Sequence, residues 1–322
     1  AGQAVMRSGW EQDARYLMFE VGPFGIGHQH EDKLGLFLWG WGQPLLTDAG
    51  TYSYDHSKWR RFVLSTAAHN TVMVDGMGQQ RRGLGETYAV DRPQQGVWAT
   101  NELFDWCVGR YDSGYGEDRI PCTHERSVIY LRPDAYIVID RLLDAEGDHL
   151  YEALFNLDAE DATIQEDGLT VSSTDAGEPN LTLMPLATEG LSVRIAKGQE
   201  EPLLGWVPRE DHRAIPCAVY SKQGPTPQMM VTLMLPHPTD EAPAVEAELL
   251  AQTDEMVAIR IDREEGEETV LCAFDGPTAM EADGIATNAR VAVVRRDEDG
   301  AVSGGLVDGT ELTCNGDPVA TQ

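Results

Sequence analysis

The sequence is short of basic residues and of long apolar runs. Only 24 Lys and Arg stand against 54 Asp and Glu in 322 residues, giving a formal net charge of −30. Because phosphate binding needs a basic face, this balance argues against nucleic acid as a partner, and it argues equally against anionic membranes. No run of about eighteen apolar residues occurs, so no membrane-spanning helix is expected.

The sequence also has few cysteines, and their spacing is not that of a disulfide framework. The chain has five cysteines, an odd number, and no two of them form a CxxC pair. A disulfide framework or a cysteine-based zinc site is therefore not expected. A single bridge between Cys107 and Cys122 is the one pairing that we leave open.

Helical periodicity is weak. Only residues 241–255 have a helix-forming composition, interrupted by Pro243, and one further turn is expected near residues 56–62. Short β-rich segments broken by Gly, Pro, Asp and Asn dominate instead, and residues 127–131 and 136–140 read as a hairpin around Arg132-Pro133-Asp134. The sequence thus predicts an all-β fold, a large antiparallel β-sandwich over residues 1–235 followed by a smaller β domain over residues 236–322. A boundary near residues 185–200 is the alternative.

Side chains capable of metal binding or acid–base chemistry are concentrated between residues 22 and 72, which hold four of the eight histidines. If His28-Gln29-His30 is a strand, its two imidazoles share one face, because strand side chains alternate. Three neighbouring antiparallel strands could then bring together His30, Asp48 and His69. Two imidazoles and a carboxylate suit Zn²⁺, although other divalent metals would bind such a set as well. The alternative is that the histidines lie at the surface or make hydrogen bonds without binding a metal.

Further residues of this region could serve a site. Alternation would place Tyr52 and Tyr54 on one strand face, where a tyrosine beside a cation can act as general acid or base, or simply pack. A local basic patch could clamp a carboxylate or sulfate, or could be a solvated turn; it consists of Lys58, Arg60, Arg61, Arg81 and Arg82. Gln79 could reach the same cleft. Asp32 and Asn70 could orient the metal-binding histidines through hydrogen bonds.

Three segments together carry a resemblance to a known family. GHQHEDKL, LLTDAGTYSY and WRRFVLSTAAHNTVMVDG resemble the central β-domain signature of the heparinase II/III-like polysaccharide lyases. The resemblance is dense over residues 5–85 and looser to about residue 155. A Gly-His-x-His-x-Asp box followed by Asp-x-Gly-x-Tyr and His-Asn-Thr-Val is much more specific than any one of these pieces.

The resemblance implies particular roles for these residues. It implies a structural zinc held by His30, Asp48 and His69, with His28 and either Tyr52 or Tyr54 facing the substrate as catalytic groups. It implies β-elimination on an acidic polysaccharide, either alginate or a glycosaminoglycan, with Arg60, Arg61 and Gln79 as candidate substrate contacts. It also implies a periplasmic or secreted bacterial protein, although the sequence shows no signal peptide.

The chain also departs from the family pattern. Such lyases carry an N-terminal helical toroid that supplies part of the active site, and this chain begins where that toroid would end. We therefore expect one wall of an active site, with the toroid as the partner that supplies the other wall. The alternatives are a non-catalytic carbohydrate-binding or structural β-sandwich module, and a metal-dependent hydrolase.

Overall fold

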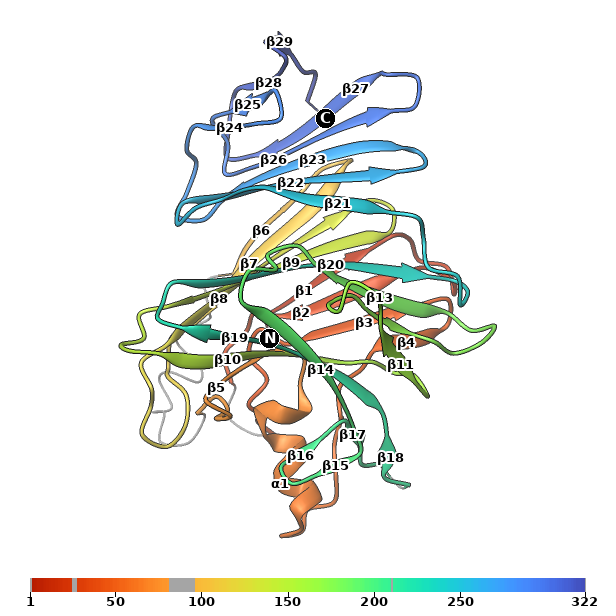
Figure 1. Ribbon diagram of the computed structural model, residues 1–322, viewed down its shortest axis with the longest axis vertical. Coiled ribbons are helices and arrows are strands. Elements are labelled where there is room, and N and C mark those ends of the chain that lie inside the picture. The colour runs from red at the N-terminus through yellow and green to blue at the C-terminus, as the bar shows by residue number, and fades with distance from the viewer. Residues whose placement is uncertain (1, 25–27, 81–95, 210, 322) are drawn as a thin grey trace. The chain divides into compact units, whose positions relative to one another are not determined.

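The computed structural model describes residues 2–24, 28–80, 96–209 and 211–321 (Figure 1). The predicted basic residues Arg81 and Arg82 lie outside these ranges. Within them strands are the dominant regular element and helix is confined to two short segments, so the prediction of an all-β fold is confirmed. By its internal packing the chain divides into two units, residues 1–98, 107–128 and 133–242 forming the first, and residues 99–106, 129–132 and 243–322 forming the second.

Three sheets make up most of the first unit. One has the order β1-β2-β3-β4, with strands β1 (Gln3–Arg7), β2 (Tyr16–Glu20), β3 (Leu36–Gly40) and β4 (Gln43–Leu46). Another has the order β14-β19-β10-β5, with strands β5 (Val72–Val74), β10 (His149–Asn156), β14 (Leu191–Lys197) and β19 (Pro216–Gly224). The largest has the order β11-β12-β13-β20-β9-β8-β7-β6, with strands β6 (Val97–Thr100), β7 (Phe104–Tyr111), β8 (Thr123–Leu131), β9 (Ala135–Leu143), β11 (Ala162–Ile164), β12 (Val171–Ser173), β13 (Asn180–Pro185) and β20 (Gln228–His237).

Burial follows the sequence pattern in these sheets. Strands β2 and β3 alternate between buried and half-buried residues, so one face of their sheet packs inward. Strand β9 is buried along nearly its whole length, as its continuous apolar run predicts. Tyr220 of β19 is buried and donates its hydroxyl to the carbonyl of Leu183 in β13, at 3.2 Å, which joins two sheets face to face. The first unit is therefore a layered β-sandwich.

Small elements gather at one end of the first unit. They are helix α1 (Lys58–Leu64), the 3₁₀ helix η1 (Thr66–Ala68) and two short hairpins, β15 (Gln199–Glu200) with β16 (Leu203–Leu204) and β17 (Trp206–Val207) with β18 (Arg213–Ala214) (Figure 1). Helix α1 starts where the Ser57 side chain accepts a hydrogen bond from the Arg60 main-chain nitrogen. Its apolar side, Phe62 and Val63, packs in a cluster with Leu203 and Trp206. The turn expected near residues 56–62 is thus a short helix.

The second unit contains two further sheets. Their orders are β21-β22-β23-β26-β27 and β24-β25-β28-β29, with strands β21 (Glu246–Gln252), β22 (Met256–Arg263), β23 (Gly266–Ala273), β24 (Met280–Ala282), β25 (Ile285–Thr287), β26 (Val291–Asp297), β27 (Val302–Val307), β28 (Leu312–Cys314) and β29 (Asp317–Pro318). The helix expected within residues 241–255 is wrong, because this segment forms β21 and pairs with β22 from Glu246 to Gln252. Hydrogen bonding to the neighbouring strand β22 outweighs the weak helix propensity of the segment.

Two other sequence expectations can be checked here. All five cysteines are free and buried, so the bridge left open between Cys107 and Cys122 is not formed. Strands β8 and β9 are neighbours in their sheet, joined through residues 132–134, which confirms the predicted hairpin. Among the described residues, no helix is long and apolar enough to cross a membrane.

A buried ionic network fixes β8 and β9 to the segments that carry the histidines. Arg126 of β8 is fully buried and donates to both carboxylate oxygens of Asp140 on β9, at 2.6 and 3.0 Å. Its Nη1 also donates to the carbonyls of Leu34 and Asn70, each at 2.7 Å. His124 contacts the same carboxylate at 2.6 Å. Burial alone would raise the pKa of Asp140, but Arg126 and His124 hold that pKa far below its ordinary value.

Removing this guanidinium should destabilise the protein strongly. Arg126→Ala leaves the Asp140 carboxylate buried without its main partner, and we expect the free energy of unfolding to fall by about 3–5 kcal/mol. Urea denaturation measures the change. Arg110→Ala is the matched control, because its exposed ion pair with Asp144 should contribute at most about 1 kcal/mol. An equal, small loss in both variants would contradict the role assigned to Arg126.

Candidate functional site

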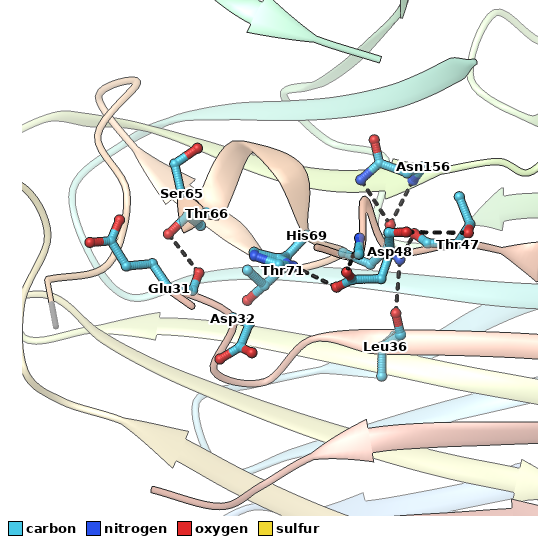
Figure 2. A network of polar contacts seen from close by, with 12 residues as sticks. Glu31, Asp32, Leu36, Thr47, Asp48, Ser65, Thr66, His69, Thr71 and Asn156 are labelled. Atoms are coloured by element: carbon cyan, nitrogen blue, oxygen red, sulfur yellow. Dashed lines mark hydrogen bonds and ion pairs between the residues drawn. The ribbon is translucent and has the colours of Figure 1, made fainter. Parts of the chain in front are cut away.

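The centre of the candidate site is a hydrogen-bonded pair, Asp48 and His69. Asp48 follows β4 and His69 ends η1, and their Oδ2 and Nδ1 atoms are 2.5 Å apart (Figure 2). Asp48 also accepts the main-chain N–H of Gly50 at 2.7 Å. Burial would lower the pKa of His69, but the adjacent Asp48 carboxylate outweighs this effect and raises it; His69 in turn lowers the pKa of Asp48.

The other ring nitrogen of His69 is buried and has no hydrogen-bond partner among the described residues. When neutral His69 donates its Nδ1 proton to Asp48, Nε2 presents a lone pair. A neutral imidazole with a free ring nitrogen is the form of histidine that binds a metal. The orphaned nitrogen is therefore the feature of this structure that fits a metal.

His30 is the second imidazole at this point. Its ring centroid lies 5.3 Å from that of His69. Burial and the neighbouring His69 lower the pKa of His30, which favours its neutral, metal-binding form, while Asp32 and Asp48 act in the opposite direction. Among the described residues, no group of three or more His, Cys, Asp or Glu is arranged so that it could hold a metal ion. The donor types fit zinc.

The strand geometry expected for these residues is wrong, although the side chains meet. Residues 28–30 are not in a strand, and His28 has a left-handed backbone with φ 56°. Strands β4 and β5, which flank Asp48 and His69, belong to different sheets. The connections between strands, rather than three neighbouring strands of one sheet, bring the metal candidates together.

Asn70 fixes these connections by crossing three segments of main chain. Its buried side-chain amide donates to the carbonyls of Leu36 and Thr47, at 2.8 and 2.7 Å, and its Oδ1 accepts the main-chain N–H of Asn156 at 2.6 Å. The hydrogen bonds of the Asn70 side chain go to Leu36, Thr47 and Asn156, and none within the described residues goes to the side chain of His69 or Asp48. Asn70 therefore holds the backbone beside both residues, which differs from the direct orienting bond that the sequence predicted.

Asp32, the other predicted orienting residue, acts through its charge. Its carboxylate forms an ion pair with buried Lys33 at 3.2 Å. Its charge opposes the lowering of the His30 pKa and contributes to the raising of the His69 pKa. The structure places Asp32 in the same polar network as His69 (Figure 2). Its influence on the histidines is therefore electrostatic.

An exposed His–Tyr pair stands at the surface of the same region. The Tyr54 hydroxyl lies 2.6 Å from His28 Nδ1, and the Arg60 guanidinium stacks over the Tyr54 ring at 4.5 Å. Tyr54 is 77% exposed, so this pair is open to a ligand. A tyrosine hydrogen-bonded to an imidazole can exchange a proton with it, which is the capacity that acid–base chemistry needs.

A second His–Tyr pair includes a residue that the sequence did not reveal. The Tyr52 hydroxyl lies 2.9 Å from Nε2 of His212, which comes from the loop between β17 and β18. The His212 ring stacks on Trp59, with centroids 4.5 Å apart, and Trp59 packs edge-on against Trp206. Residues 51–54 are not in a strand, so the expectation that Tyr52 and Tyr54 share a strand face is wrong. Each tyrosine meets a different histidine.

The three residues predicted to contact substrate, Arg60, Arg61 and Gln79, differ in exposure and in hydrogen-bond partners. Arg60 lies between the two pairs, since it also reaches the Tyr52 carbonyl at 3.4 Å. Arg61 is exposed and donates to the carbonyl of His56. Gln79 is 1% exposed, and its side-chain amide exchanges two hydrogen bonds with the main chain of Lys33. These hydrogen bonds use the Gln79 amide within the protein, and its contact with substrate stays a prediction.

A polar cavity opens beside the second pair. It has a volume of about 720 Å³ and is lined by Thr51, Tyr52, Ser53, Arg209 and Asp211. Every lining side chain carries a polar group, and the volume suits a small organic ligand. No signal in the sequence tied residues 209–212 to this region, because they lie more than 150 positions beyond Tyr52.

The comparisons with known proteins agree on one family. Residues 1–248 match the family model described as heparinase II/III-like, C-terminal. The heparin-sulfate lyase of Pedobacter heparinus is 25% identical over 147 residues, 44% of this chain and 20% of that protein. The heparin-sulfate lyase of Bacteroides stercoris is 23% identical over 205 residues, 62% of this chain and 28% of that protein. The chain thus covers less than a third of the length of these relatives.

Solved structures show the same fold. The heparan sulfate lyase HepC from Pedobacter heparinus matches with a TM-score of 0.68 and 21% identity, covering 85% of this chain and 41% of that chain. A heparinase III matches with a TM-score of 0.68 and 17% identity over the same shares. At this level of identity the likeness establishes the arrangement of strands.

The Asp48–His69 pair yields a prediction about proton binding. In metal-free protein, Asp48→Asn should lower the pKa of His69, because the carboxylate that raises it is removed while burial remains. Titration of the ring by nuclear magnetic resonance measures this pKa. The same pair should stabilise wild-type protein below pH of about 6.5, and the contribution should be lost as the pH rises through the raised pKa of His69. An unchanged His69 pKa in Asp48→Asn would contradict the assignment.

Proposed function

Because the chain belongs to the heparinase II/III-like C-terminal family, we propose that it forms the β-sheet part of a polysaccharide lyase. The substrate is an acidic, uronic-acid-containing polysaccharide, either a glycosaminoglycan or alginate, and the reaction is β-elimination. The heparin-sulfate lyase names of the curated relatives support the glycosaminoglycan. The observation that carries the proposal is the presence of two hydrogen-bonded His–Tyr pairs on either side of Arg60.

The pairs suit the proton transfers of the elimination. The reaction removes the proton at C5 of the uronate, breaks the C4–O bond and leaves an unsaturated sugar, while the leaving oxygen gains a proton. In this proposal Tyr52 or Tyr54 acts as base or acid, and the histidine bonded to its hydroxyl relays the proton. Arg60 and Arg61 would face the negative charge of the substrate, which acidifies the C5 proton.

The Asp48–His69 pair, with His30 beside it, suits a structural metal in this proposal. His30, Asp48 and His69 would hold a zinc ion, which would brace the connections between strands and take no part in the proton transfers. A separate helical toroid would supply the other wall of the cleft. The parent protein would be periplasmic or secreted, because its substrate is too large to enter a cell.

The lyase reaction has a direct test. The chain, alone and together with its helical region, is incubated with heparan sulfate, chondroitin, hyaluronan and alginate, and ultraviolet absorbance follows the unsaturated product. We expect Tyr54→Phe to lower kcat by about 100-fold or more if Tyr54 transfers the proton. Tyr16→Phe is the matched control, since Tyr16 packs on Phe37 and Trp39 in the first sheet. Absence of product from every acidic glycan with both parts present would refute the proposal, and binding without cleavage would indicate a carbohydrate-binding module.

The metal has its own test. Wild-type protein should bind one equivalent of zinc, and His30→Ala should lose both the metal and part of its stability, because metal binding and folding are coupled. Metal analysis of purified protein and thermal unfolding measure the two losses. His56→Ala is the control, since His56 is an exposed residue away from the pair. One equivalent of zinc retained by His30→Ala would overturn the ligand assignment.

A further inference from the structure

The polar cavity beside Tyr52 has features of a binding site for one acidic sugar. It is lined by two segments that are distant in sequence, Thr51–Ser53 and residues 209 and 211. The first segment contributes hydroxyl groups to the lining, and the second contributes a guanidinium and a carboxylate. A sugar ring presents hydroxyl groups that both donate and accept hydrogen bonds, so such a mixed lining suits it.

Arg209 is the cationic group of this cavity. It is exposed, and within the described part of the chain it makes no hydrogen bond or ion pair. Its guanidinium packs against Gly50, where an added Cβ would lie 3.8 Å from Nε. Gly50 has a left-handed backbone with φ 70°, and its main-chain N–H donates to Asp48. The turn that follows the Asp48–His69 pair therefore also packs against the Arg209 guanidinium.

The neighbouring arginines are less available. Arg60 is engaged by the Tyr54 ring and the Tyr52 carbonyl, and Arg61 donates to the His56 carbonyl at 2.7 Å. Arg209 therefore offers a planar fork of donors whose hydrogen-bonding capacity is unused by the described residues. Such a fork matches a carboxylate in geometry and charge.

Tyr52 is held in place for the same ligand. His212 contacts its hydroxyl at 2.9 Å and is itself fixed by stacking on Trp59. The charged and titratable groups that face this hydroxyl or line the cavity are His212, Arg209 and Asp211, with Arg60 at the Tyr52 carbonyl. The loop that carries Arg209 thus also carries the residue that positions Tyr52.

We propose that this cavity is a subsite for a uronate residue, with Arg209 binding its carboxylate and Asp211 accepting hydrogen bonds from its hydroxyls. The subsite deepens the proposed lyase function and rests on it for the choice of an acidic glycan. It assigns recognition of the acidic group to a loop between β17 and β18, outside the motif-bearing stretch at residues 22–72.

Binding measurements test the subsite without relying on catalysis. Isothermal titration calorimetry compares an unsulfated heparan oligosaccharide, whose acidic groups are glucuronate carboxylates, with the same oligosaccharide after reduction of its carboxyl groups. A sulfated, carboxyl-reduced oligosaccharide distinguishes sulfate from carboxylate as the anion. We expect Arg209→Ala to raise the Kd for the carboxylated ligand by about tenfold or more, because a charge-assisted hydrogen bond is lost.

Two further variants sharpen the result. Arg209→Lys keeps the charge without the planar fork and should bind with intermediate affinity. Arg110→Ala, which removes an exposed arginine from β7, should bind like wild type. The proposal is overturned if Arg209→Ala matches Arg110→Ala, if wild type binds intact and reduced ligands equally, or if it binds neither. Binding that depends on Arg209, without unsaturated product from any acidic glycan, would retain the subsite and refute the lyase reaction.

Discussion

The buried guanidinium of Arg126 is the interaction on which the site depends. It neutralises Asp140 and donates hydrogen bonds to two main-chain carbonyls, one at Leu34 and one at Asn70. Because an unpaired charge in the interior is costly, these four groups must stay together in the folded state. Asn70 extends this hydrogen-bonded network to the site. It follows His69 in the chain, and its side chain donates to the carbonyl of Thr47, the residue before Asp48. The position of the Asp48–His69 pair is thus set by hydrogen bonds to backbone, which leave little freedom to the connections that carry it.

The candidate site has two layers that differ in burial. His69 is buried and Asp48 is half-buried where they meet. The carboxylate and the imidazole shift each other's pKa, and one nitrogen of His69 has no partner among the described residues. The two His–Tyr pairs lie farther out, and Tyr54 is mostly exposed. A buried, fixed layer suits a bracing metal, while an exposed layer suits exchange of protons with a large polymer that must enter and leave.

Particular residues show where sequence reasoning succeeded. The strand segments, the hairpin at residues 132–134 and the family were predictable, because alternation, turn residues and a specific set of motifs are local in the sequence. The local geometry was not. His28-Gln29-His30 and Tyr52–Tyr54 look like strands by spacing, yet they lie in connections, and residues 246–252 form a strand despite a helix-forming composition. In each case pairing with a distant strand, or the lack of such a partner, decided the conformation.

The sequence by itself determined the all-β class and the family, because these follow from composition and short-range motifs. Only the tertiary structure decided which groups face a ligand. It buried Gln79 against Lys33, gave each tyrosine a different histidine, and brought Arg209 and His212 to Tyr52 from a hairpin far along the chain. Such contacts arise from the closing of long loops between packed sheets, and no local pattern in the sequence records which loops will meet.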